Sequence, residues 1–111
     1  MSRVTDLHTV GSVAAVLANM VGGAAAQVHG DTATQISTVT HDSRAVDSGS
    51  LFACLRGGRV DGHDFADAAV EAGAAALLVD HRLESATVSG VAQLIVDDTR
   101  LRLGPIAATL M

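Results

Sequence analysis

A glycine pair between two arginines is the first feature of this sequence that could do chemistry. Residues 54–65 read "CLRGGRVDGHDF", in which Gly57 and Gly58 lie between Arg56 and Arg59. Glycine lets backbone amides approach an anion closely, and the arginine guanidinium adds a planar fork of donors. The segment could therefore cradle a phosphate or a carboxylate. A glycine turn with solvated arginines explains the same residues, and composition alone favours that simpler interpretation.

A second polar segment, "HDSR" at residues 41–44, could complete such an anion site. Ser43 supplies a hydroxyl donor and Arg44 a further cation. Each segment follows a run of strand length, and ligands of open α/β sheets bind where the loops after neighbouring strands meet. The sequence therefore predicts one binding site shared by the two loops. The residues that could support an anion there are Arg44, Arg56 and Gly57.

Two His-Asp pairs suggest a different chemistry. His41-Asp42 and His63-Asp64 resemble the pairs of certain metal-dependent phosphohydrolases, and imidazole with carboxylate suits Zn, Mn or Fe. In those enzymes the ligands project from helices, whereas His41 stands at the expected end of a strand. Neighbouring strand residues point to opposite faces of a sheet, so His41 and Asp42 would not readily share an ion. A metal-dependent phosphohydrolase therefore stays an alternative with less support.

The composition argues against several classes of function. The 111 residues carry a net charge of −5, whereas a nucleic-acid or membrane-surface binder needs a basic face. The sequence contains no lysine, so it has no P-loop lysine for ATP. Cys54 is the single cysteine, which excludes an internal disulfide and suits a reducing cytoplasm. Its apolar setting, "LFACL", predicts a buried and unreactive thiol.

The elements that must position these residues follow from the apolar pattern. Short β-branched or apolar runs predict strands, and apolar residues at helical spacing predict helices. The expected strands cover residues 34–41, 51–55, 74–80 and 92–97. The expected helices cover residues 12–21, residues 65–72 and a terminal segment that begins at residues 97–99. This order predicts an α/β fold in one domain, with a small, mostly parallel sheet flanked by helices.

Individual residues refine the helix boundaries. Ser12 is expected to cap the first helix, and Asp64 is expected to cap the second, which Gly73 ends. The inner stripe of the second helix is expected to comprise Phe65, Ala68, Ala69 and Ala72. Pro105 lacks a backbone donor and predicts a bend in the terminal helix near residues 101–105. No apolar run is long enough to predict a transmembrane span.

Residues 40–80, "THDSRAVDSGSLFACLRGGRVDGHDFADAAVEAGAAALLVD", closely resemble the N-terminal domain of the Mur ligases. The family pattern has Asp-Ser-Arg after a strand, then Leu-Phe in a strand, a glycine turn, Asp-Gly-His-Asp-Phe and an alanine-rich helix. Residues 93–110, "QLIVDDTRLRLGPIAATL", resemble the end of that domain, whereas residues 1–25 match only weakly. Within the family, the chain is most similar to the ligases that extend UDP-N-acetylmuramoyl-L-alanyl-D-glutamate (MurE type). The D-alanyl-D-alanine ligases (MurF type) come second.

The resemblance implies a positioning role in an ATP-dependent ligase of peptidoglycan precursor synthesis. In such a ligase this domain would bind the UDP part of UDP-N-acetylmuramoyl-L-alanyl-D-glutamate. The substrate contacts that the resemblance assigns are His41, Ser43, Gly58, Arg59 and Val60. The chain departs from common family versions at position 41, which is often apolar, and at Ser48, where proline is common.

The same resemblance places ATP and Mg²⁺ in a central domain and the incoming amino acid in a third domain. Neither domain is in these 111 residues, and the apolar helical pattern still continues at Met111. We therefore expect the first domain of a longer cytoplasmic ligase, without ligase activity by itself. A stand-alone α/β binding or regulatory module is an alternative, as is the phosphohydrolase with His-Asp pairs.

Overall fold

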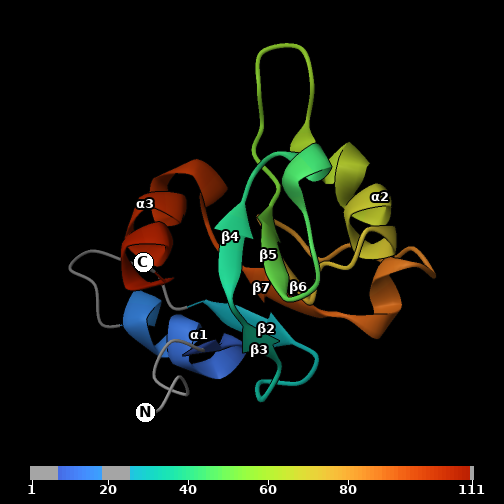
Figure 1. Ribbon diagram of the computed structural model, residues 1–111. Helices are drawn as coiled ribbons and strands as arrows, with labels where there is room; N and C mark the ends of the chain where they lie inside the picture. The colour runs from blue at the N-terminus through green and yellow to red at the C-terminus, as the bar shows by residue number, and fades with distance from the viewer. Residues whose placement is uncertain (1–7, 19–25, 111) are drawn as a thin grey trace.

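The structure, a computed structural model, describes residues 8–18 and 26–110. Its centre is a five-stranded sheet in the order β2-β7-β6-β5-β4 (Figure 1). The strands are β2 (Gln27–His29), β4 (Thr38–Thr40), β5 (Ser50–Ala53), β6 (Ala76–Val79) and β7 (Ala92–Ile95). Strands β4 to β7 run parallel, and β2 pairs antiparallel with β7 at one edge. The mostly parallel sheet confirms the α/β fold.

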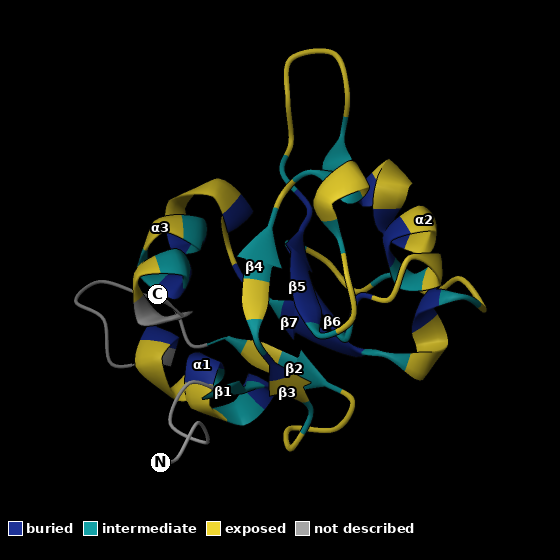
Figure 2. Ribbon diagram, viewed as in Figure 1, coloured by how far each residue is buried: buried dark blue, intermediate teal, exposed yellow. Residues whose placement is uncertain are grey.

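Helices cover both faces of this sheet. They are α1 (Val10–Ala18), α2 (Ala66–Glu71) and α3 (Thr99–Leu110). Helices α1 and α3 lie on one side and α2 on the other (Figure 1). Alternate side chains of β5 enter the two layers, so Leu51 packs in the α1 and α3 layer and Phe52 in the α2 layer. Every residue of β5 and β6 is buried (Figure 2), which explains their continuous apolar runs.

The first helix begins two residues earlier than its pattern predicts. Ser12 was expected to precede the helix, yet α1 starts at Val10. The backbone N–H of Ser12 donates to Thr9 Oγ1 at 3.0 Å, and the Thr9 N–H donates to Ser12 Oγ at 3.1 Å. These reciprocal bonds make Thr9 the capping residue. The predicted end of the helix, at residues 19–21, lies outside the described residues.

The single strand expected at residues 34–41 is two strands. The first, β3 (Gln35–Ile36), pairs antiparallel with β1 (His8–Thr9) in a separate small sheet. The second, β4, joins the main sheet beside β5. Ser37 lies between them, and its N–H donates to the Gly49 carbonyl at 3.0 Å instead of to a neighbouring strand. The antiparallel strand β2 was not expected from the sequence.

The second helix starts differently from the prediction. Asp64 does not cap it; Asp61 caps the 3-10 turn that precedes α2, because its carboxylate accepts from the His63 N–H at 3.0 Å. A 3-10 turn over Gly62–Phe65 then leads into α2. The buried residues of α2 are Ala66 and Ala69. Of the predicted inner stripe only Ala69 is buried, and the exposed members are Phe65, Ala68 and Ala72. Gly73, with φ of 117°, does end the helix.

The terminal helix begins at Thr99, within the expected range. The Asp98 carboxylate accepts from the Leu101 N–H at 3.0 Å and so satisfies one free donor of the first turn. Ile106 is fully buried against the sheet, whereas Leu101 of the predicted apolar face is 61% exposed. Pro105 lies inside the helix. No helix in the described part of the chain is long and apolar enough to cross a membrane.

Candidate functional site

The loops after β4 and β5 meet in a pocket at the carboxyl ends of the parallel strands. The pocket has a volume of about 590 Å³. Strand β5 and the starts of α2 and α3 complete its walls. The lining residues are His41, Asp42, Ser43, Arg44, Phe52, Leu55, Gly57, Val60, Gly62, Phe65 and Arg100. The pocket therefore has a polar rim on the side of β4 and an apolar wall on the side of β5.

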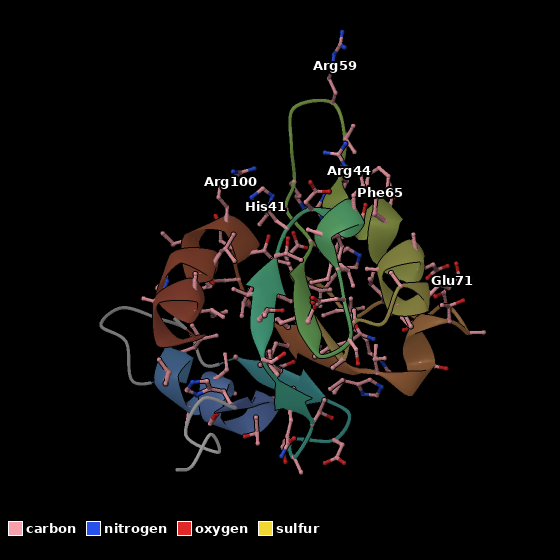
Figure 3. The ribbon with its side chains drawn as sticks, viewed as in Figure 1. His41, Arg44, Arg59, Phe65, Glu71 and Arg100 are labelled. Carbon is pink, nitrogen blue, oxygen red and sulfur yellow. The ribbon has the colours of Figure 1, made fainter. Side chains whose placement is uncertain are left out.

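Most of the sequence-predicted residues come together here. His41, Ser43 and Val60 line the pocket, and so do Arg44 and Gly57 from the predicted anion support. Gly58 and Arg59 are exposed and are not among the lining residues. In Figure 3 the Arg59 side chain stands at the outer end of the loop and points away from the body of the protein. Of the predicted segment at residues 58–60, only Val60 therefore lines the pocket.

The loop after β5 is closed by its own backbone. The Gly57 N–H donates to the Val60 carbonyl at 2.8 Å, and the Gly62 N–H donates to the Leu55 carbonyl at 2.7 Å. A Cβ at Gly62 would lie 2.7 Å from the Leu55 nitrogen, whereas a Cβ at Gly58 would meet nothing within 4 Å. The Gly57 N–H is therefore already used in a hydrogen bond within the loop. Gly62 is the glycine that this close backbone approach requires.

Carboxylates neutralise two of the arginines that were expected to support an anion. Arg44 donates through Nε and Nη2 to the Asp42 carboxylate, both at 3.1 Å, while its side chain stays 89% exposed. These hydrogen bonds lower the pKa of Asp42. Arg56 donates to both oxygens of Asp80 and, at 3.1 Å, to Asp61. Arg56 is therefore a structural cation, and it does not line the pocket.

His63 holds this loop to the end of β6, a role that the sequence did not reveal. The side chain is only 4% exposed. Its Nδ1 bonds to Asp61 Oδ1 at 2.5 Å, and its Nε2 accepts from the Asp80 N–H at 3.2 Å. Because Nε2 accepts, Nδ1 carries the proton of the neutral ring. The one available signal was an aspartate two residues before a histidine, which is too common to be specific.

The carboxylates of this network have lowered pKa values. Hydrogen bonds from Arg56 lower the pKa of Asp80 to about 2, although its partial burial opposes the shift. The pKa of Asp61 is also lowered, first by the backbone N–H of His63 and then by its ring. Both groups are therefore anions at neutral pH. They balance the charge of Arg56 and fix the position of the loop.

The geometry does not fit the metal alternative. Among the described residues, His63, Asp80 and His81 form the group with three ligand atoms within 4.8 Å of one another. His41, Asp42 and Asp64 do not belong to that group, so the two predicted His-Asp pairs are not brought together. The His63 and His81 rings stack with centroids 4.8 Å apart and planes 25° apart. In-plane lone pairs of two stacked rings converge poorly on one ion. The Asp80 carboxylate is also bound by Arg56.

The buried thiol fits its prediction. Cys54 is fully buried and free. Burial raises the pKa of its thiol to about 12, with further contributions from Asp61 and Asp80. A thiol with this pKa is protonated at neutral pH and is a poor nucleophile. Cys54 is therefore part of the core.

Arg100 is the charged pocket residue that sequence reasoning missed, and the apolar lining residues Phe52, Leu55 and Phe65 were not predicted for the site either. It is the second residue of α3, and its side chain lies beside that of His41 in Figure 3. It also lines a smaller polar cavity of about 330 Å³, whose other residues are Arg56, Asp80, Asp97, Asp98 and Thr99. Arg100 comes 44 residues after Arg56 in the chain, and only the fold brings it to the pocket.

Comparisons with known proteins show the family to which this chain is similar. The sequence model of the Mur ligase family, catalytic domain, matches residues 35–109, which include both pocket loops. A UDP-N-acetylmuramoyl-L-alanyl-D-glutamate–2,6-diaminopimelate ligase from Streptomyces coelicolor is 45% identical over 97 residues, 86% of this chain and 18% of that protein. A UDP-N-acetylmuramoyl-tripeptide–D-alanyl-D-alanine ligase from Escherichia coli is 48% identical over 73 residues, 66% of this chain and 15% of that protein.

Solved structures show the same arrangement of elements. Crystal structure II of MurF from Acinetobacter baumannii superposes with a TM-score of 0.73 and 30% sequence identity. The match covers 93% of this chain and 21% of that one. A further MurF crystal structure from the same organism has a TM-score of 0.72. The chain therefore spans about a fifth of the length of the relatives that it matches.

Proposed function

The chain belongs to the Mur ligase family, and from this premise we propose that it binds the uridine diphosphate end of a UDP-N-acetylmuramoyl-peptide. The ligand would occupy the pocket between the loops at residues 41–44 and 56–62. The observation that carries the proposal is the meeting of these two loops in one pocket at the carboxyl edge of the sheet. Ligands of open α/β sheets bind at that edge.

The chemistry of the walls suits a nucleotide. Phe52, Leu55 and Phe65 offer an apolar wall against which a pyrimidine base could pack. Ser43 and His41 supply polar groups on the opposite side. The proposed substrate contacts are His41, Ser43, Gly58, Arg59 and Val60. For Gly58 and Arg59 the proposal requires the loop to bend toward the pocket, because neither lines it and the Arg59 side chain points away from it.

The proposed contribution to catalysis is positioning. Binding energy from the remote nucleotide end would hold the substrate carboxylate where a ligase activates it and an amine attacks. The 111 residues contain no lysine and do not fit a P-loop site for ATP. ATP and Mg²⁺ would therefore be bound by other parts of a longer cytoplasmic ligase. The 45% identity to a diaminopimelate ligase supports the MurE type, with the MurF type as the alternative.

A titration with UDP tests this proposal. We expect millimolar UDP to shift the backbone NMR signals of residues 41–44 and 56–62 in the uniformly ¹⁵N-labelled chain. Ser43→Ala should weaken UDP binding about 2- to 10-fold, the range expected for one lost hydrogen bond. Ser89→Ala is the matched control, because Ser89 is exposed and lines neither cavity. Signal shifts confined to other parts of the chain would overturn the assignment.

A further inference from the structure

The position of Arg100 links the two loops of the pocket to the first turn of α3. Its Nη2 donates to the backbone carbonyl of Arg56 at 3.3 Å, so the guanidinium reaches the loop after β5. The side chain lines the main pocket and also the smaller polar cavity. In Figure 3 it lies on the side opposite Phe65, with His41 nearby. Arg100 therefore stands with His41 on one side of the pocket, and Phe65 lies on the other side together with Arg44.

The surrounding arginines differ from Arg100 in their pairing. Arg44 is paired with Asp42, and Arg56 is paired with Asp61 and Asp80. Arg102, two residues further along α3, makes two 2.9 Å bonds to the Asp97 carboxylate. Within residues 8–18 and 26–110, no ion pair involves Arg100. Four of the five N–H groups of its guanidinium have no partner recorded in that part of the chain.

An unpaired guanidinium at a pocket wall favours an anionic ligand. Guanidinium groups bind phosphate through two parallel hydrogen bonds, and charge-assisted bonds of this kind are stronger than neutral ones. The predicted cations of the site do not provide such a group, because Arg44 and Arg56 are neutralised and Arg59 points outward. Of the two arginines that line the pocket in this structure, Arg44 and Arg100, only Arg100 is therefore without an ion pair among the described residues.

We propose that Arg100 is the anion-binding residue of the pocket and that it holds a phosphate group of the bound nucleotide. This inference rests on the proposed function and adds an orientation to it. The phosphates lie toward the start of α3, and the base lies toward Phe65. The first turn of α3 then carries a substrate-binding residue in addition to the two loops.

Binding of UDP and uridine to three proteins tests the inference. The proteins are the unaltered chain, Arg100→Gln and Arg82→Gln. Arg82 is a matched control because it is exposed, lines neither cavity and has no ion pair in the described part of the chain. We expect Arg100→Gln to weaken UDP about 10-fold or more, as for a hydrogen bond to a charged group. Its uridine affinity should stay within about 2-fold, because uridine lacks the phosphates, and Arg82→Gln should change neither affinity.

Further measurements separate this inference from structural effects. Arg100→Lys retains the charge and should recover part of the UDP affinity. Equal weakening of UDP and uridine in Arg100→Gln would assign Arg100 a structural role through the Arg56 carbonyl and overturn the inference. Inorganic pyrophosphate should bind the unaltered chain less tightly than UDP, because it leaves the apolar wall empty. Pyrophosphate binding as tight as that of UDP would overturn the proposed orientation.

The same data distinguish failure of the proposed function from failure of the inference about Arg100. If UDP at millimolar concentration shifts no signals of residues 41–44 and 56–62, the proposed function fails, and this inference fails with it. If UDP shifts those signals and Arg100→Gln binds it within 2-fold of the unaltered chain, only the inference about Arg100 fails.

Discussion

At the end of β6, the Asp80 carboxylate accepts hydrogen bonds from Arg56 and His81, while the Asp80 N–H donates to His63. Asp80 thus joins the end of β6 to three side chains. Two of them are Arg56, in the loop after β5, and His63, in the 3-10 turn that follows this loop. The carboxylate is 15% exposed, so water screens these bonds only in part. This arrangement predicts that the charge of Asp80 stabilises the folded chain.

We expect Asp80→Asn to lower the free energy of unfolding at pH 7 by about 1 kcal/mol, allowing for solvent screening at exposed Arg56. The folded pKa of Asp80, about 2, lies below its ordinary value of 3.8. Its stabilisation is therefore complete above about pH 4 and disappears as the pH falls toward 2. Urea denaturation at pH 7 and pH 2.5 should show a difference between the two proteins that shrinks in acid.

Asp64→Asn is the matched control for this experiment. Asp64 is exposed, and it does not cap α2. Its replacement should leave stability within about 0.5 kcal/mol of the unaltered chain. An Asp80→Asn protein as stable at pH 7 as the Asp64→Asn protein would contradict the role assigned to the Asp80 charge.

At the scale of elements, the loop after β5 is held by a backbone contact at Gly62. We predict that Gly62→Ala destabilises the chain by about 1–3 kcal/mol, because its Cβ would lie 2.7 Å from the Leu55 nitrogen and 2.9 Å from the Leu55 oxygen. Gly58→Ala, in the same loop but with open space around it, should change stability by less than about 0.5 kcal/mol. Thermal unfolding followed by circular dichroism measures both. Equal melting temperatures for the two variants would show that the contact does not constrain the loop.

The strands of the buried sheet could be predicted because their sequence pattern reflects their surroundings. Residues 51–55 and 74–79 are continuous apolar runs, and both strands are covered by helices on both faces. The break at Ser37 could not be predicted, since residues on both sides of it have β-branched or alternating patterns. Only pairing with distant partners assigns β3 and β4 to different sheets.

The two loops of the site could be predicted from the sequence, but the ion pairs that their arginines form could not. His41, Ser43 and Val60 were expected to share a site, and all three line the pocket. The pairing of Arg56 with Asp80 spans 24 residues, so a local motif gives no indication of it. Asp61 and Asp64 are both capping residues in sequence terms, and the local pattern does not indicate that Asp61 caps a 3-10 turn before α2 while α2 buries Ala66 and Ala69.

At the scale of the whole molecule, one sheet is shared by two separate apolar layers. Leu77 and Leu78 are adjacent in β6 and fully buried, yet Leu78 faces α1 and α3 whereas Leu77 faces α2. Because both layers rest on the same strands, neither can be lost without the other. The layers should therefore unfold together.

We expect Leu77→Ala and Leu78→Ala each to lower the free energy of unfolding by about 2–5 kcal/mol, the cost of truncating a buried leucine. Each variant should retain a single unfolding transition in urea, followed by far-ultraviolet circular dichroism. Leu101→Ala is the matched control, because that leucine is 61% exposed and should cost less than about 0.5 kcal/mol. Two separated transitions in either core variant would mean that the layers are independent.

The protruding loop after β5 is the segment that we expect a protease to cleave first. Trypsin can cut this chain only after arginine, since the sequence contains no lysine. Arg59 stands at the outer end of the loop (Figure 3), and exposed loop tips are preferred sites of nicking. Arg82 is exposed as well, but both backbone groups of the next residue, Leu83, bond to the Gln93 side chain at 2.8 and 2.9 Å.

Limited digestion should therefore make its first cut within the described residues after Arg59, giving a fragment that begins at Val60 in mass spectrometry. A first cut after Arg82 would contradict this order. A nucleotide seated beside Val60 would hold the loop and slow its cleavage. The rate of cleavage after Arg59 would then report the fraction of the chain that has a ligand in its pocket.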